Sequence, residues 1–142
     1  MPTTFAAKNL PVPRFVTIKF DEVNARTGPA IDCPIEWVFI VKGEPVEIIA
    51  EYDEWRKIKD IEGEGGWVHS SAISGNRSVV IISKNIMPLL ATPANYDAIV
   101  IKVSPGLRCS LLKCKEEWCQ IKCSSRKGWI AKKFLWGVYP DE

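Results

Sequence analysis

Short runs of alternating hydrophobic and polar residues recur along this chain, and turn residues separate them. The segments "RFVTIKF" (residues 14–20) and "EWVFIV" (residues 36–41) are rich in β-branched and aromatic residues. The segments "PVEIIAEYD" (residues 45–53) and "WRKIKD" (residues 55–60) lie on either side of a short acidic tip, which is typical of a β-hairpin. No segment has a sustained helical period. The pattern therefore predicts an all-β fold with little helix.

Glycine and proline mark the expected turns. "NARTGPA" (residues 24–30) is expected to form a turn directly after the first strand, and residues 63–66 a glycine-rich loop. "VVII" (residues 79–82) is expected to open a second unit, in which residues 89–106 repeat a turn and a strand in shortened form. Strands this short, with turn signals this frequent, indicate small barrels or sandwiches.

One pattern occurs twice. "EWRKIK" starts at Glu54, and "EWCQIK" starts 63 residues later at Glu117; "GWV" at residues 66–68 returns 62 residues later as "GWI". Such self-similarity indicates a repeated structural unit.

The repeat divides the 142 residues into three parts. We predict a flexible tail over residues 1–13, a first small barrel over residues 14–77 and a second, divergent barrel over residues 78–142. Each unit has roughly 60 residues, near the lower limit for a self-sufficient core.

Composition and charge narrow the possible functions. The chain is 46% hydrophobic and 25% charged, and no apolar run reaches the roughly 18 residues that span a bilayer. We therefore expect no transmembrane segment. Residues 1–13 contain no recognisable signal peptide, although a mature protein without its signal would look the same.

The net charge of +2 is unevenly distributed. Residues 1–78 carry 9 Lys or Arg and 12 Asp or Glu, whereas residues 79–142 carry 10 and 5. The halves either present ordinary solvated faces or attract each other, or the second half meets an anionic polymer. Because Lys132-Lys133 is the longest basic run, we expect no nucleic-acid binding.

Three motifs of the first unit carry a resemblance to a known family. The order "VNARTGP", "GEPVEIIAEYDEWRKIKD" and "GWVHSSAISG" resembles the bacterial SH3-like (SH3b) domain over residues 14–77. Residues 79–138 match more loosely, since their turn lacks the Arg and Gly, but they keep Gly106, Trp118, Ile121, Gly128 and Trp129. With the closing "LWGVYP", the chain is similar to tandem SH3-like proteins that bacteria export to the cell envelope. The resemblance implies two SH3-like barrels, no catalysis, and recognition of peptidoglycan or of envelope proteins.

Catalytic signatures are missing from the sequence. It contains no GxSxG, HExxH or P-loop, and residues 63–66 lack the context of a dinucleotide loop. Its one histidine, His69, is better explained as a polar surface residue than as half of a Cys–His pair. We predict a non-enzyme that needs no cofactor.

The aromatic residues supply candidate binding groups. Trp67 and Trp129 are expected to fill the barrels, whereas Trp55 and Trp118 lie at charged hairpin tips, where either burial or ligand binding is open. Arg26 could hold a carboxylate bidentately or form a turn-stabilising salt bridge. The candidate ligand-binding residues are Arg26, Tyr52, Glu54, Trp55 and Trp118.

The cysteines predict one disulfide and no metal site. Their C-x4-C-x4-C-x3-C spacing lacks the paired knuckles of zinc sites. The shift of 63 places Cys114 and Cys119 on Glu51 and Arg56, whose opposite charges suggest cross-strand neighbours. We therefore predict a Cys114–Cys119 disulfide worth about 2 kcal/mol. It requires a bulge or a strand end, because strict alternation puts Cys119 on the face of Ile121.

The other three cysteines are less defined. Cys109 maps onto Val46 and is expected in the core, while the pairing of Cys33, Cys109 and Cys123 stays open. A disulfide would place the protein outside the cytosol, so we expect a periplasmic or otherwise exported protein.

The leading hypothesis is a non-catalytic module that binds the cell envelope by recognising peptidoglycan or its stem peptides. The alternative is a protein–protein adaptor that binds an extended peptide or targets a separate wall hydrolase. A third hypothesis is a periplasmic sensor in which the second unit serves as a rigid brace.

Overall fold

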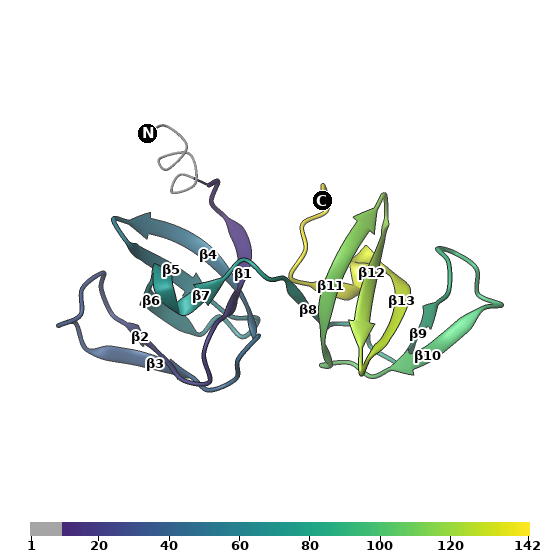
Figure 1. Cartoon of the computed structure of the whole chain (residues 1–142), viewed down its shortest axis with the longest axis horizontal. Helices are drawn as coiled ribbons and strands as arrows, with labels where there is room; N and C mark the ends of the chain where they lie inside the picture. Colours follow the sequence, from purple (N-terminus) through teal and green to yellow (C-terminus); the bar gives the residue numbers. More distant parts are fainter. Residues whose placement is uncertain (1–9) are drawn as a thin grey trace.

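The computed structural model describes residues 10–142, which form two antiparallel sheets of seven strands each, in tandem (Figure 1). The predicted tail at residues 1–13 falls largely on residues 1–9, which lie outside the described residues. The prediction of an all-β fold with two tandem small barrels is confirmed. Helical structure in the described part is limited to the 3-10 turns η1 (Ser70–Ala72) and η2 (Lys132–Phe134). Neither is long enough to cross a membrane.

The first sheet has the strand order β3-β2-β6-β5-β4-β1-β7. The turn predicted from residue 24 begins later than expected, since Asn24–Arg26 still belong to a strand; Val23 and Ala25 are both buried, so alternation continues up to Arg26. The strands are β1 (Arg14–Ile18), β2 (Val23–Arg26), β3 (Ile35–Phe39), β4 (Pro45–Tyr52), β5 (Trp55–Lys59), β6 (Gly65–His69) and β7 (Ile73–Ser74).

The second sheet repeats this arrangement with the order β10-β9-β13-β12-β11-β8-β14. Its strands begin at residue 78, so the proposed boundary between residues 77 and 78 falls between the sheets. They are β8 (Ser78–Ile81), β9 (Met87–Leu90), β10 (Ile99–Val103), β11 (Arg108–Lys115), β12 (Trp118–Cys123), β13 (Arg126–Ala131) and β14 (Leu135–Trp136).

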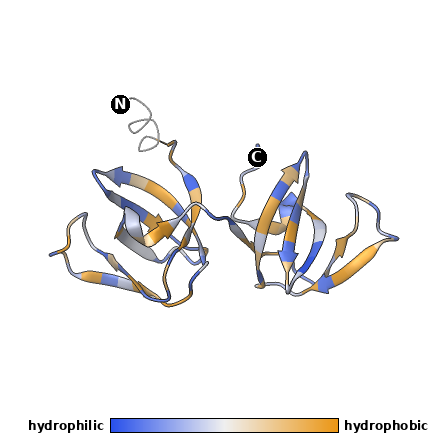
Figure 2. Cartoon of the chain, viewed as in Figure 1, coloured by the Kyte–Doolittle hydropathy of each residue, from blue (hydrophilic) through white to orange (hydrophobic). Residues whose placement is uncertain are grey.

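Each sheet encloses its own hydrophobic core. In Figure 2, hydrophobic and hydrophilic residues alternate along several strands, as expected when one face of a sheet is buried. The first core includes Val46, Ile48 and Ile58, and the second includes Leu89, Ile121 and Ile130, all with at most 1% of their surface exposed.

A β-bulge interrupts the long hairpin of each sheet at the same place. The register of β4 against β5 shifts between Ile48 and Ala50, and that of β11 against β12 shifts between Leu111 and Lys113. One extra residue reverses the side to which the following side chains point. After the bulges, Glu51 lies opposite Arg56 in the first hairpin, and Cys114 lies opposite Cys119 in the second.

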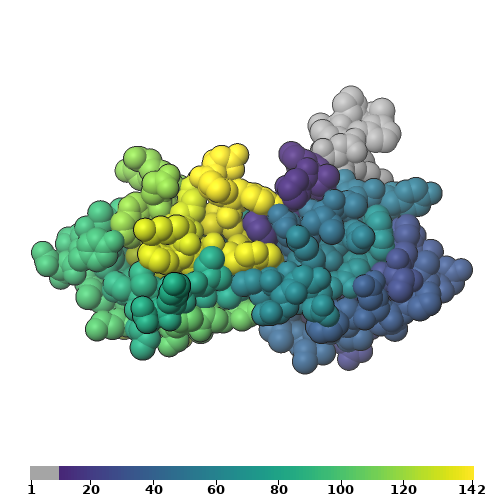
Figure 3. Space-filling model, turned by 180° about the vertical axis from the view of Figure 1, so that it is seen from behind, coloured from purple at the N-terminus to yellow at the C-terminus, as the bar shows by residue number. Residues whose placement is uncertain are grey.

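The two sheets contact each other around the segment that joins them (Figure 3). The Phe15 ring packs against Trp136 and Tyr139, with centroid distances of 5.0 and 4.5 Å. Arg108 forms an ion pair with Glu44 at 2.9 Å, and the Ser78 hydroxyl donates to the Gly43 carbonyl at 2.7 Å. These contacts link the negative first half to the positive second half.

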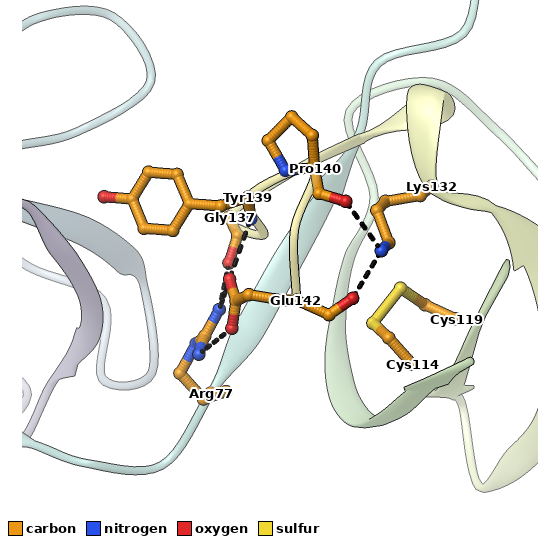
Figure 4. The surroundings of a disulfide bond; sticks show 8 residues. All are labelled: Arg77, Cys114, Cys119, Lys132, Gly137, Tyr139, Pro140 and Glu142. Carbon is orange, nitrogen blue, oxygen red and sulfur yellow. Dashed lines mark hydrogen bonds and ion pairs between the residues drawn. A yellow bond between two sulfur atoms is a disulfide. The ribbon is translucent and has the colours of Figure 1, made fainter. Parts of the chain in front are cut away.

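The C-terminal residues complete this junction (Figure 4). Arg77 donates to the Glu142 carboxylate and to the Gly137 carbonyl, at 2.8 and 2.7 Å. The Tyr139 hydroxyl donates to the Glu47 carboxylate. The buried Lys132 ammonium donates to the main-chain oxygens of Pro140 and Glu142. Residues 137–142 thus bridge both sheets.

Candidate functional site

Two hairpin tips present the repeated tryptophans. The β4–β5 hairpin turns at Asp53 and the β11–β12 hairpin at Glu116, with positive φ angles of 52° and 55°. Two residues after each comes a half-buried tryptophan, Trp55 or Trp118. Because the next residue of each strand is buried, both rings lie on the outer surface of their sheet.

The first tip brings together three of the five candidate binding residues. Tyr52 is 64% exposed and lies opposite Trp55 in the hairpin register. The Trp55 indole packs edge-to-face against the His69 ring at a centroid distance of 5.6 Å. The Ser70 hydroxyl donates to the Glu54 carboxylate at 3.4 Å. The tip is therefore a packed cluster from which the Tyr52 ring projects.

Arg26 lies on the same outer surface, one register row away from the tip. Arg26, Trp67 and Lys57 lie side by side in one row across strands β2, β6 and β5. Trp55 and His69 form the next row on this surface. The Nη1 atom of Arg26 donates to the Cys33 carbonyl at 3.0 Å. This bond closes the loop after β2 and takes the place of the salt bridge considered from the sequence.

The second tip forms a groove. Its larger part has a volume of about 420 Å³ and is lined by Met87, Tyr96, Glu117, Trp118, Ala131, Lys133 and Phe134. A second part of about 320 Å³ is lined by Pro93, Lys115, Glu116 and Trp118. Trp118 is common to both, and we call the two parts together the Trp118 groove. The exposed Tyr96 ring meets the Trp118 indole at a centroid distance of 6.2 Å.

The tips differ in the residue that faces the tryptophan across the strands. The register partner of Trp55 is His69, whose ring packs against the indole. The register partner of Trp118 is Ala131, a groove-lining residue with only a methyl group. The smaller neighbour leaves one side of the Trp118 ring open, and the groove occupies that side.

The groove combines aromatic surface with charge. Tyr96, Trp118 and Phe134 supply rings, and Lys133 and Glu117 supply opposite charges. The Lys133 ammonium lies 5.2 Å from the centre of the Phe134 ring. An apolar surface with a few charged groups suits ligands that have both an apolar face and polar substituents, such as sugars and short peptides.

Trp67 and Trp129, the second pair of repeated tryptophans, lie away from the hairpin tips. Trp129 is 9% exposed, and the Lys113 ammonium lies 5.8 Å from its ring centre. Trp67 is half-buried on the outer surface between Lys57 and Arg26. Neither ring belongs to the hydrophobic core of its barrel, because alternation along β6 and β13 places Val68 and Ile130 inside and the two tryptophans outside. The expectation that Trp67 and Trp129 fill the barrels is therefore wrong.

A disulfide lies directly beneath the second tip. Cys114 and Cys119 are register partners, next to the Lys115–Trp118 pair, and their Cα atoms are 4.0 Å apart. This is the pair that the repeat offset singled out. The bulge in β11 supplies the local irregularity that the pairing required.

A second disulfide joins Cys109 to Cys123, a pairing that the sequence alone left open. Cys109 is buried, as expected, but it is bonded rather than a simple core residue. Counting back from the Cys114–Cys119 pair without a bulge places Cys109 opposite residue 124. The bulge restores the offset by one residue and brings Cys109 opposite Cys123. Cys33 remains a free, half-buried thiol.

Possible metal ligands and His69 are the remaining candidates for chemistry. Within residues 10–142, no three His, Cys, Asp or Glu side chains are grouped so that they could hold a metal ion. The Nδ1 atom of His69 lies 2.8 Å from the Ser71 hydroxyl and accepts from the Ser71 amide. These contacts, with the Trp55 packing, give His69 a structural role in the first tip.

Comparison with known proteins adds two findings. A family model described as "Bacterial SH3 domain" matches the chain twice, over residues 19–75 and 83–137. "Putative N-acetylmuramoyl-L-alanine amidase YrvJ" of Bacillus subtilis (strain 168) is 26% identical over 128 residues. That match covers 83% of this chain but 24% of the relative, so the chain spans about a quarter of the relative's length.

Two solved structures, NlpC1 and NlpC2 from Trichomonas vaginalis, also match. NlpC1 is 13% identical with a TM-score of 0.39, and the match covers 89% of this chain and 46% of the NlpC1 chain. NlpC2 is 12% identical with a TM-score of 0.41, covering 92% and 50%.

Proposed function

This chain belongs to the bacterial SH3 domain family, and we propose that it is a non-catalytic module that binds the bacterial cell wall. Two matches of the family model support the proposal, as does a relative named as a putative N-acetylmuramoyl-L-alanine amidase. A module repeated in tandem can hold a protein on a polymer that itself repeats.

The Trp118 groove is the observation that carries the proposal. A sugar ring presents an apolar face that stacks on an indole, and the stem peptides of peptidoglycan carry carboxylates that Lys133 and Lys115 could pair with. Trp118 would supply the stacking surface, with Tyr96 at its edge. Glu117 would accept hydrogen bonds from hydroxyl or amide groups.

The first tip remains a second candidate contact. Tyr52, Glu54 and Trp55 are close together, and Arg26 lies one row away with one hydrogen bond to a carbonyl. In this proposal the Tyr52 ring and the Arg26 guanidinium contact the ligand, while Trp55 supports the tip through its packing on His69. We expect the first tip to contribute less than the Trp118 groove.

Export from the cytosol is part of the proposal. The two disulfides of the second sheet support it, because disulfides persist in oxidising compartments. A wall ligand also requires that the protein reach the outside of the cytoplasmic membrane.

Co-sedimentation with purified, protein-free peptidoglycan tests the proposal. The natural chain should pellet with the polymer, and Trp118→Ala should weaken binding about tenfold or more, since stacked aromatic residues dominate such sites. Trp55→Ala is the matched control at the equivalent position and should weaken binding less. If the natural chain stays in the supernatant, wall binding is wrong; if Trp55→Ala is the more damaging change, the first tip is the main site.

A protein–protein adaptor is the second candidate function. The exposed apolar side chains of β3 favour it, since such surfaces often contact other proteins. Binding to protein-free peptidoglycan separates the two functions, because an adaptor would need a protein to be present.

A further inference from the structure

Exposed apolar side chains are concentrated on one edge of the first sheet. β3 is an edge strand, the first in the sheet order, and four of its five residues are exposed. Of the 17 large hydrophobic side chains exposed within residues 10–142, six lie in the eleven residues from 31 to 41. They are Ile31, Ile35, Trp37, Val38, Ile40 and Val41. We call residues 31–41 the β3 edge.

The equivalent edge of the second sheet is better covered. β10 is the edge strand there, and only two of its five residues are exposed. Ile99 is 47% exposed, close to the 49% of Ile35 at the start of β3, but the next two residues of β10 are half-buried. Edge position alone therefore does not account for the exposure of Trp37 and Val38.

A pocket of about 410 Å³ adjoins the β3 edge where the two sheets meet. It is lined by residues 37–41 of the first sheet with Glu44 and Asp60, and by Arg108 of the second sheet. Arg108 forms an ion pair with Glu44 at the rim, and Asp60 also lines the pocket. Two carboxylates, Glu44 and Asp60, line the pocket with one guanidinium, so the rim is net negative.

We propose that the β3 edge and this pocket bind an extended segment of a partner protein, whose apolar side chains pack on Trp37 and Val38 while a Lys or Arg meets the acidic rim. An edge strand has unpaired main-chain groups along one side, which an added strand can satisfy. The apolar side chains of the β3 edge and the pocket contact every second side chain of the added strand. The acidic rim favours a Lys or Arg at the next position of that strand. This site shares no residue with the Trp118 groove, so it does not depend on wall binding.

A synthetic peptide tests the site directly. The probe is Lys-Thr-Val-Thr-Val-Thr-Lys, labelled with a fluorophore, because strand addition needs alternation and the rim needs a cation. Saturable binding of this probe to the full chain by fluorescence anisotropy is expected below about 1 mM, the weak end of specific association. Amide chemical shifts in the ¹⁵N spectrum should change most over β3, at residues 35–39.

Two matched variants provide the control. Val38→Asp and Ile99→Asp each place a carboxylate on an exposed apolar position of an edge strand, 39% and 47% exposed. Val38→Asp should weaken probe binding about tenfold or more, since it puts a charge at the centre of the contact. Ile99→Asp should leave binding unchanged. Thermal unfolding midpoints that match the natural chain would show that both variants are folded.

Several results would overturn the proposal. Absence of saturable binding at about 1 mM, or shifts centred on β10, would rule out the β3 edge as the site. Equal binding of a probe with Glu in place of Lys would remove the role of the acidic rim. Concentration-dependent self-association of the natural chain that shifts the same β3 amides would identify a second copy, rather than a partner protein, as the occupant.

Discussion

The long hairpins of the two sheets use different chemistry at the same place. In the first sheet, the Glu51 carboxylate lies opposite Arg56 and forms ion pairs with both Arg56 and Arg14, at 3.1 and 2.9 Å. In the second sheet, the equivalent pair is the Cys114–Cys119 disulfide. Both pairs follow a bulge and face the inside of the barrel near its rim. The backbone thus fixes a close cross-strand pair, and either an ion pair or a covalent bond can satisfy it.

The other end of each hairpin shows the same contrast. Val46 lies at the position of Cys109, and Asp60 at that of Cys123. The Asp60 carboxylate accepts from the amides of Glu62 and Glu64 and so holds the longer loop before β6. In the second sheet a two-residue turn at Ser124 and Ser125, both with positive φ, replaces this loop. The shorter turn brings the strand ends together, and a disulfide bonds them.

The largest effect should come from breaking the ion pair. Glu51→Ala leaves Arg56, which is 6% exposed, without a carboxylate, and loss of one partner of a buried pair costs roughly 3 kcal/mol. Urea unfolding measures this change. The double variant Glu51→Cys, Arg56→Cys places a cysteine pair at the positions equivalent to Cys114 and Cys119. Under oxidising conditions, the resulting disulfide should recover most of the lost stability. A Glu51→Ala loss below about 1 kcal/mol would mean that the pair is only a surface contact.

The two disulfides should contribute unequally. Cys109 and Cys123 are 14 residues apart, and Cys114 and Cys119 are 5 apart, so the longer loop loses more entropy when closed. Replacing both cysteines of a pair by Ala should cost about 3 kcal/mol for the first and about 2 kcal/mol for the second. Calorimetry of the two double variants, with the reduced natural chain as reference, measures both values. The reverse order would contradict the loop-entropy explanation.

Electrostatic attraction between the halves should have a smaller effect. Arg108→Ala removes the ion pair with Glu44. Because the Arg108 side chain is 42% exposed, this loss should lower the free energy of unfolding by less than about 1 kcal/mol at low salt. Lys122→Ala, at an exposed position of the same half, should change stability little. Unfolding at low and high salt measures the difference, which should shrink as salt screens the pair. Equal losses at both salt concentrations would point to packing instead.

The two smallest effects concern pH, and the first of them involves Tyr139. Burial, together with the hydrogen bond to Glu47, raises the pKa of the Tyr139 phenol. The neutral phenol is therefore favoured in the folded chain, and its contribution is complete below the ordinary tyrosine pKa of about 10. It is lost as pH rises from there through the raised folded pKa. Stability measured between about pH 9 and 11 should fall less steeply for Tyr139→Phe than for the natural chain.

The Glu142 carboxylate should make the stability of the folded chain depend on pH in the opposite direction, at low pH. Burial alone would raise the pKa of its carboxyl, but the hydrogen bonds from Arg77 and from the Tyr139 amide lower it below the ordinary value. The ionised carboxylate therefore stabilises the folded chain above the ordinary Glu pKa, and that contribution is lost as pH falls through the lowered one. In Glu142→Gln, the acid limb of the stability curve should be shallower. An unchanged acid limb would contradict this.

Much of the hairpin chemistry was readable from the sequence because the two copies can be compared. Opposite charges at Glu51 and Arg56 pointed to the neighbouring cysteines of the second copy. The Cys109–Cys123 bond was missed, because a bulge changes the register by one residue and alternation alone does not reveal it. The open side of Trp118 was also missed, although a shift of 62 residues does align His69 with Ala131.

The sequence by itself determined the fold class, the repeat and the place of the tryptophans at two hairpin tips, because strand alternation and turn residues are local properties. Only the tertiary structure decided which tip is open, since that depends on the residue opposite each ring on a neighbouring strand. The exposed β3 edge and the pocket beside Arg108 likewise appear only when strands distant in sequence meet. Local patterns specify which face of a strand is buried, but the neighbours of that strand specify what remains uncovered.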